Sequence, residues 1–313
     1  MTENTIVNFT DAATGWQKVF YAFLAEKEQR SGSHRTVEGY SRMLQDFFGG
    51  SGKQPDNVTA KDIFVYSHSP GLSGKQFSTV TIGARIACIS SFFRFLIRNN
   101  MVQSNPCDKL QRPQTSFSTP RGLSGDQAYK LLEVVPNSPL GLRDRAIILT
   151  LVLTGRRRAE VIGLKSGNLI LDGDGAFYTY RGKGGKREHR ELPQPALNAI
   201  RASLGAFGMD LATMSPDESL WPSLSHHSKG ITSGTFYGNL QRYFRKAGIT
   251  PSGVHIFRHT AAKLRRDAGE TVEDVSRFLD HSSLAVTTVY LRRLEGEQDK
   301  SWAKVAEAIG LHS

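Results

Sequence analysis

The chain has 313 residues, 39% of them hydrophobic and 9% aromatic, which is enough apolar surface for real cores and excludes a disordered chain. This length exceeds what one core usually needs, so we expect two domains. A membrane-spanning or secreted protein is not expected, because there is no run of about 18 apolar residues and no basic N-terminal stretch followed by an apolar one. The 2 cysteines are too few for a disulfide framework or a cysteine zinc site. The sequence therefore predicts a soluble cytoplasmic protein.

The charge balance points to a polyanionic partner. The chain carries 40 Lys and Arg against 29 Asp and Glu, a net charge of +11, and its pI is about 9.7. Residues 1–118 contribute +4 and residues 119–313 contribute +7. Two positive halves suit a polyanion held between them better than one basic tail would. Nucleic acid is the favoured partner, and a merely basic soluble enzyme is the alternative.

The first third of the chain has helical periodicity. Apolar residues at helical spacing predict four helices. The first begins near residue 14, the second spans about 35–48, and the last spans about 78–100. A shorter helix between the second and the last should begin after Thr59, its N-cap. The Gly-Gly-Ser-Gly stretch at 49–52 should end the second helix. Together these helices predict a small bundle. Its polar faces carry the pairs Arg35 and Arg42, and Arg94 and Arg98, each pair on one helix face. They are either solvated surface or phosphate contacts.

A linker signal divides the chain. Residues 105–122 hold 3 prolines and little apolar periodicity, so we expect a helical domain over 1–108, a linker over 109–122 and a second domain over 123–313. Alternating runs over 168–192, separated by glycine turns, predict a small antiparallel sheet. The other expected helices lie at about 123–135, 141–153, 194–206, 232–247, 255–268, 271–279, 283–290 and 298–310. The fold class is mostly α with one small antiparallel β-sheet.

Several familiar sites are excluded by their motifs. HExxH, GxSxG, GxxxxGK[ST] and GxGxxG do not occur, which removes the commonest hydrolase and nucleotide-binding classes. His255 and His259 have the spacing of a zinc pair, but the residues between them are Ile-Phe-Arg, with no neighbouring carboxylate. We therefore expect no metal.

The remaining candidates are basic groups late in the chain. Three arginines occupy 156–158, directly after an apolar helix, and Glu160 is near enough to orient a guanidinium. Lysines follow on a β-turn, His255 and Arg258 share a helix face, and His281 and Tyr290 come later. Such a set fits phosphoryl transfer: guanidinium groups clamp phosphate oxygens, a tyrosine can be the covalent nucleophile, and a lysine can protonate the leaving oxygen.

These segments, in this order, resemble a known family. TGRRRAEVIGL, RGKGGKR, HIFRHT, FLDHSS and TTVY resemble the catalytic domain of the tyrosine site-specific recombinases, the phage-integrase and Xer-type family. The helical first part resembles that family's core-binding (SAM-like) DNA-binding domain, so the likeness covers about residues 14–295. The resemblance implies a catalytic tyrosine-recombinase domain over 123–313.

The resemblance also implies roles for single residues. The catalytic set would be Arg157, Lys183, His255, Arg258, His281 and the nucleophile Tyr290, with Glu160 in support and Lys186 as the alternative to Lys183. Two departures stand out: Arg156 and Arg158 fill positions that are usually apolar, and Asp280 stands where glycine is usual. Asp280 could raise the basicity of His281 or cap a helix. The other tyrosines that we considered, Tyr178, Tyr180, Tyr237 and Tyr243, are expected to serve packing.

The implied reaction needs neither metal nor cofactor, and no small-molecule substrate. Tyr290 would form a 3′-phosphotyrosyl link with double-stranded DNA and free a 5′-hydroxyl. A homo-tetramer, possibly with a related recombinase, would exchange strands of two duplexes through a Holliday junction in the nucleoid. A type IB topoisomerase and a catalytically inactive DNA-binding accessory protein are the alternatives.

The biological role has several candidates. The length suits Xer-type chromosome resolvases and compact transposon, plasmid or integron enzymes alike, and no additional arm-binding domain is expected before residue 14. The arginine run and Asp280 favour a mobile element. The amphipathic last helix, at about 298–310, either packs on its own domain or docks onto a neighbouring protomer.

Overall fold

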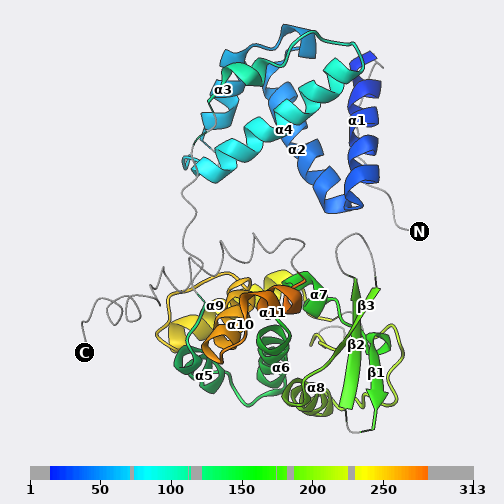
Figure 1. The fold of residues 1–313 in the computed structure, drawn as a ribbon, viewed down its shortest axis with the longest axis vertical. Coiled ribbons are helices and arrows are strands. Elements are labelled where there is room, and N and C mark those ends of the chain that lie inside the picture. The colour runs from blue at the N-terminus through cyan, green and yellow to red at the C-terminus, as the bar shows by residue number, and fades with distance from the viewer. Residues whose placement is uncertain are drawn as a thin grey trace, which may run out of the picture. The chain divides into compact units, whose positions relative to one another are not determined.

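The computed structural model describes residues 15–70, 74–111, 113, 122–173, 175–181, 187–224 and 230–280. The chain divides into two compact units, Met1–Phe117 and Ser118–Ser313 (Figure 1). Helices dominate both units, and a three-stranded antiparallel sheet lies in the second. The fold class expected from the sequence is therefore confirmed.

The first unit is built from helices with clear start signals. Its elements are α1 (Gly15–Ser31), α2 (His34–Ser51), a 3-10 turn (Pro55–Asn57), α3 (Ala60–His68), α4 (Thr79–Arg98) and a second 3-10 turn (Pro106–Lys109). Thr59 caps α3 as expected, in a reciprocal capping box with Asp62. The expected end of α2 is wrong by three residues, because the helix continues through Gly49 and Gly50. It ends at Gly52, whose φ of 62° gives the left-handed turn that closes the helix.

An aromatic cluster forms the core of the first unit. Phe92 of α4 stacks on Phe20 of α1 with ring centroids 4.6 Å apart and meets Phe23 edge-on at 5.2 Å. Among the described helices, α4 is long and apolar enough by length and composition to cross a membrane, although Arg85 and Arg94 interrupt its apolar residues. Its apolar residues Ile86, Ile89 and Phe92, however, are buried among the other helices of the unit, as in a core helix.

The second unit places its sheet beside short helices (Figure 1). In chain order the elements are α5 (Gly125–Glu133), α6 (Pro139–Thr154), α7 (Arg158–Ile162), a 3-10 turn (Ser166–Asn168), β1 (Leu169–Asp172), β2 (Gly175–Arg181), β3 (Arg187–Glu191), α8 (Gln194–Ala206), α9 (Ser233–Lys246), α10 (Ile256–Asp267) and α11 (Val272–Phe278). The central strand β2 pairs with both neighbours, so that Tyr178 lies opposite Leu169 and Arg190. The helices expected at 283–290 and 298–310 lie outside the described residues.

A buried ion pair stiffens the core of the second unit. Arg143 and Asp144 of α6 are joined at 2.8 Å, with 3% and 0% of their side chains exposed. Asp144 also accepts bonds from Asn239 at 2.9 Å and from the Tyr243 hydroxyl at 2.8 Å. A buried charge needs such partners. Tyr243 therefore does more than the packing expected of it.

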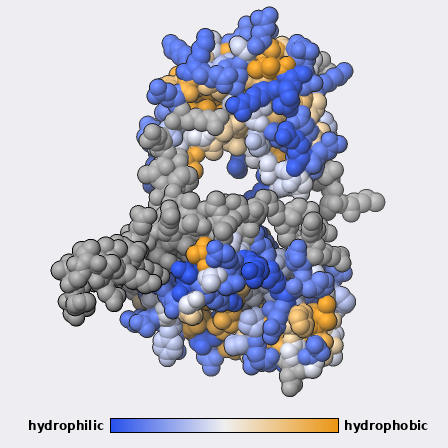
Figure 2. All heavy atoms as spheres, in the orientation of Figure 1, coloured by the Kyte–Doolittle hydropathy of each residue, from blue (hydrophilic) through white to orange (hydrophobic). Residues whose placement is uncertain are grey.

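The outer face seen in Figure 2 is mostly hydrophilic, with scattered apolar patches.

Helix α6 ends where the candidate site begins. Gly155 adopts φ 62° and donates its N–H to the Leu151 carbonyl, which closes the helix. A Cβ atom on Gly155 would lie 2.5 Å from a ring carbon of Phe278. Glycine is therefore required twice over at this position, by backbone conformation and by the close approach of the chain after α11.

We expect Gly155→Ala to destabilise the second unit more than Gly208→Ala does. Gly208 also has a positive φ, 70°, but open space around it, so that its substitution should cost only the left-handed backbone term of about 1–2 kcal/mol. Gly155→Ala adds a clash with Phe278, worth a further ~1–3 kcal/mol. Urea unfolding, followed by tryptophan fluorescence, would measure both variants. An equal loss of unfolding free energy in the two variants would show that the Phe278 ring moves aside without cost.

Candidate active site

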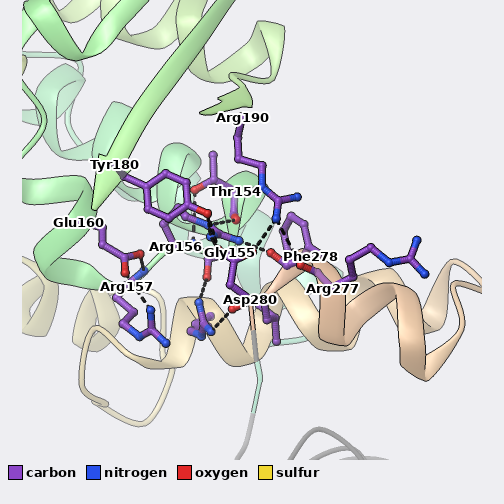
Figure 3. Close-up of polar contacts among 12 residues, drawn as sticks. Thr154, Gly155, Arg156, Arg157, Glu160, Tyr180, Arg190, Arg277, Phe278 and Asp280 are labelled. Atoms are coloured by element: carbon purple, nitrogen blue, oxygen red, sulfur yellow. Dashed lines mark hydrogen bonds and ion pairs between the residues drawn. The ribbon is translucent and has the colours of Figure 1, made fainter. Parts of the chain in front are cut away.

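Arg157 begins helix α7 and is held by a carboxylate. Glu160 accepts the backbone N–H of Arg157 at 2.8 Å and its Nη1 at 2.9 Å, so that one carboxylate holds both donors at the helix start (Figure 3). The Glu160 side chain is only 11% exposed, whereas that of Arg157 is 42% exposed. The carboxylate thus fixes one side of the guanidinium and leaves the group accessible. This is the arrangement that a phosphate-binding arginine requires.

Arg258 lies on the first turn of α10 and is buried. Its Nη1 donates to the Gly155 carbonyl at 2.7 Å, and its Nη2 donates to the Leu279 carbonyl. Burial, and then the charges of Arg157 and Arg156, lower the pKa of Arg258 to about 10. The group stays protonated at neutral pH, and its bond to the Gly155 carbonyl brings it to the turn that precedes Arg157.

His255 precedes α10 and shares this region. Its pKa lies below 6.5 because of burial and then the positive charges of Arg258 and Arg157. The imidazole is therefore neutral at pH 7, a state in which it can both accept and donate a proton. The ring also meets His259 edge-on, with centroids 4.9 Å apart.

Arg156 is buried, unlike its neighbour Arg157, and bonds to Tyr180 and Asp280 (Figure 3). Two sequence expectations change here. Tyr180 is buried by packing, as expected, but its hydroxyl also bonds to Arg156 and Asp280. Asp280 has a role that the sequence did not suggest, as the partner of Arg156 and Arg190. The sequence did hold a weak signal of this ion pair. Arg156 and Asp280 both depart from the family pattern, and they put opposite charges where uncharged residues are usual.

The region is positively charged. Among the residues that the structure describes, Arg156, Arg157, Arg190 and Arg258 interact with two carboxylates, those of Glu160 and Asp280. An excess of guanidinium groups in one region attracts phosphate through its positive charge. Phosphate binding is therefore the chemistry that this arrangement favours.

The remaining expected site residues are not part of the cluster that the structure describes. Lys183, His281 and Tyr290 are outside the described residues, as is the alternative Lys186; the chain order puts both lysines in the connection from β2 to β3. In the first unit, Arg35, Arg42 and Arg94 are exposed. Arg98 is exposed too, but it binds Glu26 at 2.8 Å. Of the other tyrosines, Tyr178 is buried and Tyr237 is 43% exposed, so the packing role expected of Tyr237 is at most partial.

Comparisons with known proteins agree on one family. A sequence profile described as the phage integrase family matches residues 121–297. The chain is 31% identical to tyrosine recombinase XerC of Alcanivorax borkumensis, over 84% of each chain. It is 28% identical to tyrosine recombinase XerC of Herpetosiphon aurantiacus, over 87% of this chain and 88% of the relative.

Solved structures share the fold. A lambda integrase dimer bound to a COC′ core site superposes with a TM-score of 0.69 at 18% identity, covering 91% of this chain and 98% of the other. XerH recombinase bound to its difH substrate gives 0.63 at 19% identity, covering 96% and 85%. With the profile match and the relatives above, these findings establish that the chain belongs to the phage integrase family of tyrosine recombinases.

Proposed function

We propose that this chain, a DNA breaking and rejoining enzyme by its family, performs site-specific recombination with Arg157 and Arg258 as its phosphate clamp and Tyr290 as its nucleophile. The observation that carries the proposal is the bond from Arg258 to the Gly155 carbonyl at 2.7 Å, between residues 103 apart in the sequence. It brings α10 to the turn that leads into Arg157. Two guanidinium groups near one phosphate stabilise the charge that grows in a five-coordinate transition state.

Each proposed role follows from chemistry that the residue type can supply. The Tyr290 oxygen forms a bond to the scissile phosphorus while the bond to the 5′ oxygen breaks. Lys183, on the β2–β3 connection, gives that oxygen its proton. The phosphotyrosyl link keeps the phosphodiester energy, so that a 5′-hydroxyl of another strand can reverse the step. His255 and His281 serve proton transfer and hydrogen bonding to the phosphate.

The proposed partners are double-stranded DNA and further copies of the chain. Two named neighbours are bound to DNA, one of them as a dimer, and the net charge of +11 suits the same partner here. We propose that four protomers act on two sites, in the cytoplasm, and exchange strands through a Holliday junction. Arg35, Arg42 and Arg94 are exposed and would meet backbone phosphates.

The recombinase outcome is favoured over a topoisomerase or an inactive accessory protein. The relatives that match most of the chain are named as recombinases, and the arginines, His255 and Glu160 are all present. A nicked suicide substrate separates the outcomes, because a recombinase transfers the cleaved strand to an added partner duplex. A topoisomerase would only reseal or relax its own substrate.

We expect Tyr290→Phe to abolish the covalent DNA adduct while leaving DNA affinity within about threefold, because only the attacking oxygen is lost. The adduct is scored as an SDS-resistant band on the chain's own target, recovered by sequencing DNA trapped on the wild-type protein. A wild type that forms no adduct on that target would favour the accessory protein.

We expect Arg157→Lys to slow cleavage about 100-fold, since an ammonium group cannot reproduce the forked grip of a guanidinium. Single-turnover cleavage at saturating DNA measures this loss. Arg201→Lys, an exposed change on α8, is the matched control. A loss in Arg157→Lys no larger than in the control would exclude Arg157 from the clamp.

We expect Arg157→Ala to raise the pKa of His255, because one of the charges that lower it disappears. NMR titration of the His255 ring would show the shift. The lowered pKa of His255 also affects stability, because the unfolded chain binds the proton more readily than the folded protein does. The wild type should therefore lose stability as the pH falls below about 6.5. A pKa that stays unchanged in Arg157→Ala would place the two side chains apart.

A further inference from the structure

The Arg156 side chain is buried and makes its hydrogen bonds within the protein. Its side chain is 2% exposed, and all three guanidinium nitrogens donate inside the protein. Nε bonds to the Thr154 carbonyl at 3.1 Å, Nη1 to the Tyr180 hydroxyl at 2.5 Å and to Asp280, and Nη2 to the Phe278 carbonyl. The guanidinium also lies over the Tyr180 ring, 4.7 Å from its centroid. Despite standing next to Arg157, this arginine cannot be a phosphate ligand.

The Asp280 carboxylate accepts hydrogen bonds from three side chains. Its Oδ2 accepts from Arg156 and Tyr180, and its Oδ1 accepts from Arg190 at 2.5 Å. Burial raises the pKa of this carboxyl, but the bonds from Tyr180 and Arg156 outweigh it and lower the pKa overall. The group is therefore ionised at neutral pH. Its backbone has φ 51°, a left-handed conformation that a side chain opposes, so that the bonds of the carboxylate hold this residue in place.

The Arg156–Asp280 pair lies next to the two backbone carbonyls that accept hydrogen bonds from Arg258. The two carbonyls that accept from Arg258 belong to Gly155 and Leu279, the residues directly before Arg156 and Asp280. The ion pair therefore joins the same two stretches of chain that Arg258 bridges, one residue further along each. If the stretches separated, Arg258 could keep only one of its acceptors.

Strand residues complete the arrangement. Tyr180 and Arg190 come from β2 and β3, and both bond to Asp280. Figure 3 shows Tyr180 and Arg190 approaching Asp280 from the sheet, with Arg156 beside them. The sheet thus fixes where the pair lies. The Arg156 side chain is 2% exposed and that of Asp280 is 27% exposed, and a polar network whose groups are bonded to one another holds its members in place.

We propose that Arg156 and Asp280, with Tyr180 and Arg190, are positioning residues: they hold the carbonyls of Gly155 and Leu279 at the spacing that orients the guanidinium of Arg258. The proposal deepens the proposed function, on which it rests for the role of Arg258 as a phosphate clamp. None of the four residues needs to touch DNA. Their effect reaches the reaction through the direction of one arginine.

A double-mutant cycle tests the coupling. Arg156→Met keeps the length of the side chain and removes its charge, and Asp280→Asn keeps the shape of a residue that tolerates a left-handed backbone. We expect each to slow single-turnover cleavage at saturating DNA about 100-fold, the effect of misplacing a catalytic group by about 1 Å. DNA affinity should change less than about threefold. Because both changes break one link, the double variant should lose about 100-fold rather than the product, about 10⁴-fold.

Two controls separate positioning from folding and from general charge. Arg158→Met removes a neighbouring positive charge that is only half-buried, and it should cleave within about threefold of wild type. Thermal unfolding, followed by circular dichroism, identifies any variant that fails to fold. Losses that multiply in the double variant, or single variants that cleave like Arg158→Met, would overturn the proposal.

A measurement without DNA keeps this proposal separate from the proposed function. The two carbonyl bonds should restrict rotation of the Arg258 guanidinium and give resolved Nη–H signals in nitrogen-15 NMR spectra, assigned by their loss in Arg258→Lys. In Asp280→Asn these signals should merge. If they merge but wild-type protein never cleaves DNA, positioning stands and the recombinase proposal fails. If they stay resolved while wild type cleaves, the positioning proposal fails.

Discussion

One guanidinium bridging two backbone carbonyls is the constraint on which the rest of the site depends. Arg258 reaches the ends of α6 and α11 at once, through Gly155 and Leu279. A carbonyl cannot move without its chain, so these bonds tie the direction of the side chain to the packing of three helices. A phosphate-binding group with a fixed direction needs less reorganisation when charge develops on its ligand.

Two left-handed residues make this bridge possible. Gly155 and Asp280 follow α6 and α11 with φ of 62° and 51°, and each turns the chain sharply after its helix. At Gly155 the absence of a side chain also lets Phe278 approach. At Asp280 a carboxylate meets Arg156, Tyr180 and Arg190. Similar backbone turns are thus accommodated in different ways, by the absence of a side chain beside a packed ring at Gly155 and by a cluster of polar bonds at Asp280.

The sequence predicted local structure well where the signal was local. Thr59 caps the expected helix, and the alternating residues of 168–192 form the expected sheet. The end of α2 was missed because glycine can continue a helix, and only Gly52 takes the left-handed turn that stops it. The contact of Arg156 with Asp280 joins residues 124 apart, and no pattern within one segment reports such a distance.

The site residues followed the same rule. Arg157 and Glu160 are three residues apart and could be paired from the sequence, as could His255 and Arg258 on one turn of helix. The strand context of Tyr178 and Tyr180 predicted packing roles, and both side chains are buried. Alternation could not reveal that the Tyr180 hydroxyl has partners, because these lie on other elements and are fixed only when the unit folds.

The ion pair also limits how this site can evolve. Replacing Arg156 alone would leave Asp280 with fewer cations, and replacing Asp280 alone would strand a cation that is 2% exposed. A lineage that carries the pair must therefore exchange both positions nearly together to return to an uncharged contact. Such paired replacement should appear as covariation of positions 156 and 280 among descendants, with mixed combinations rare.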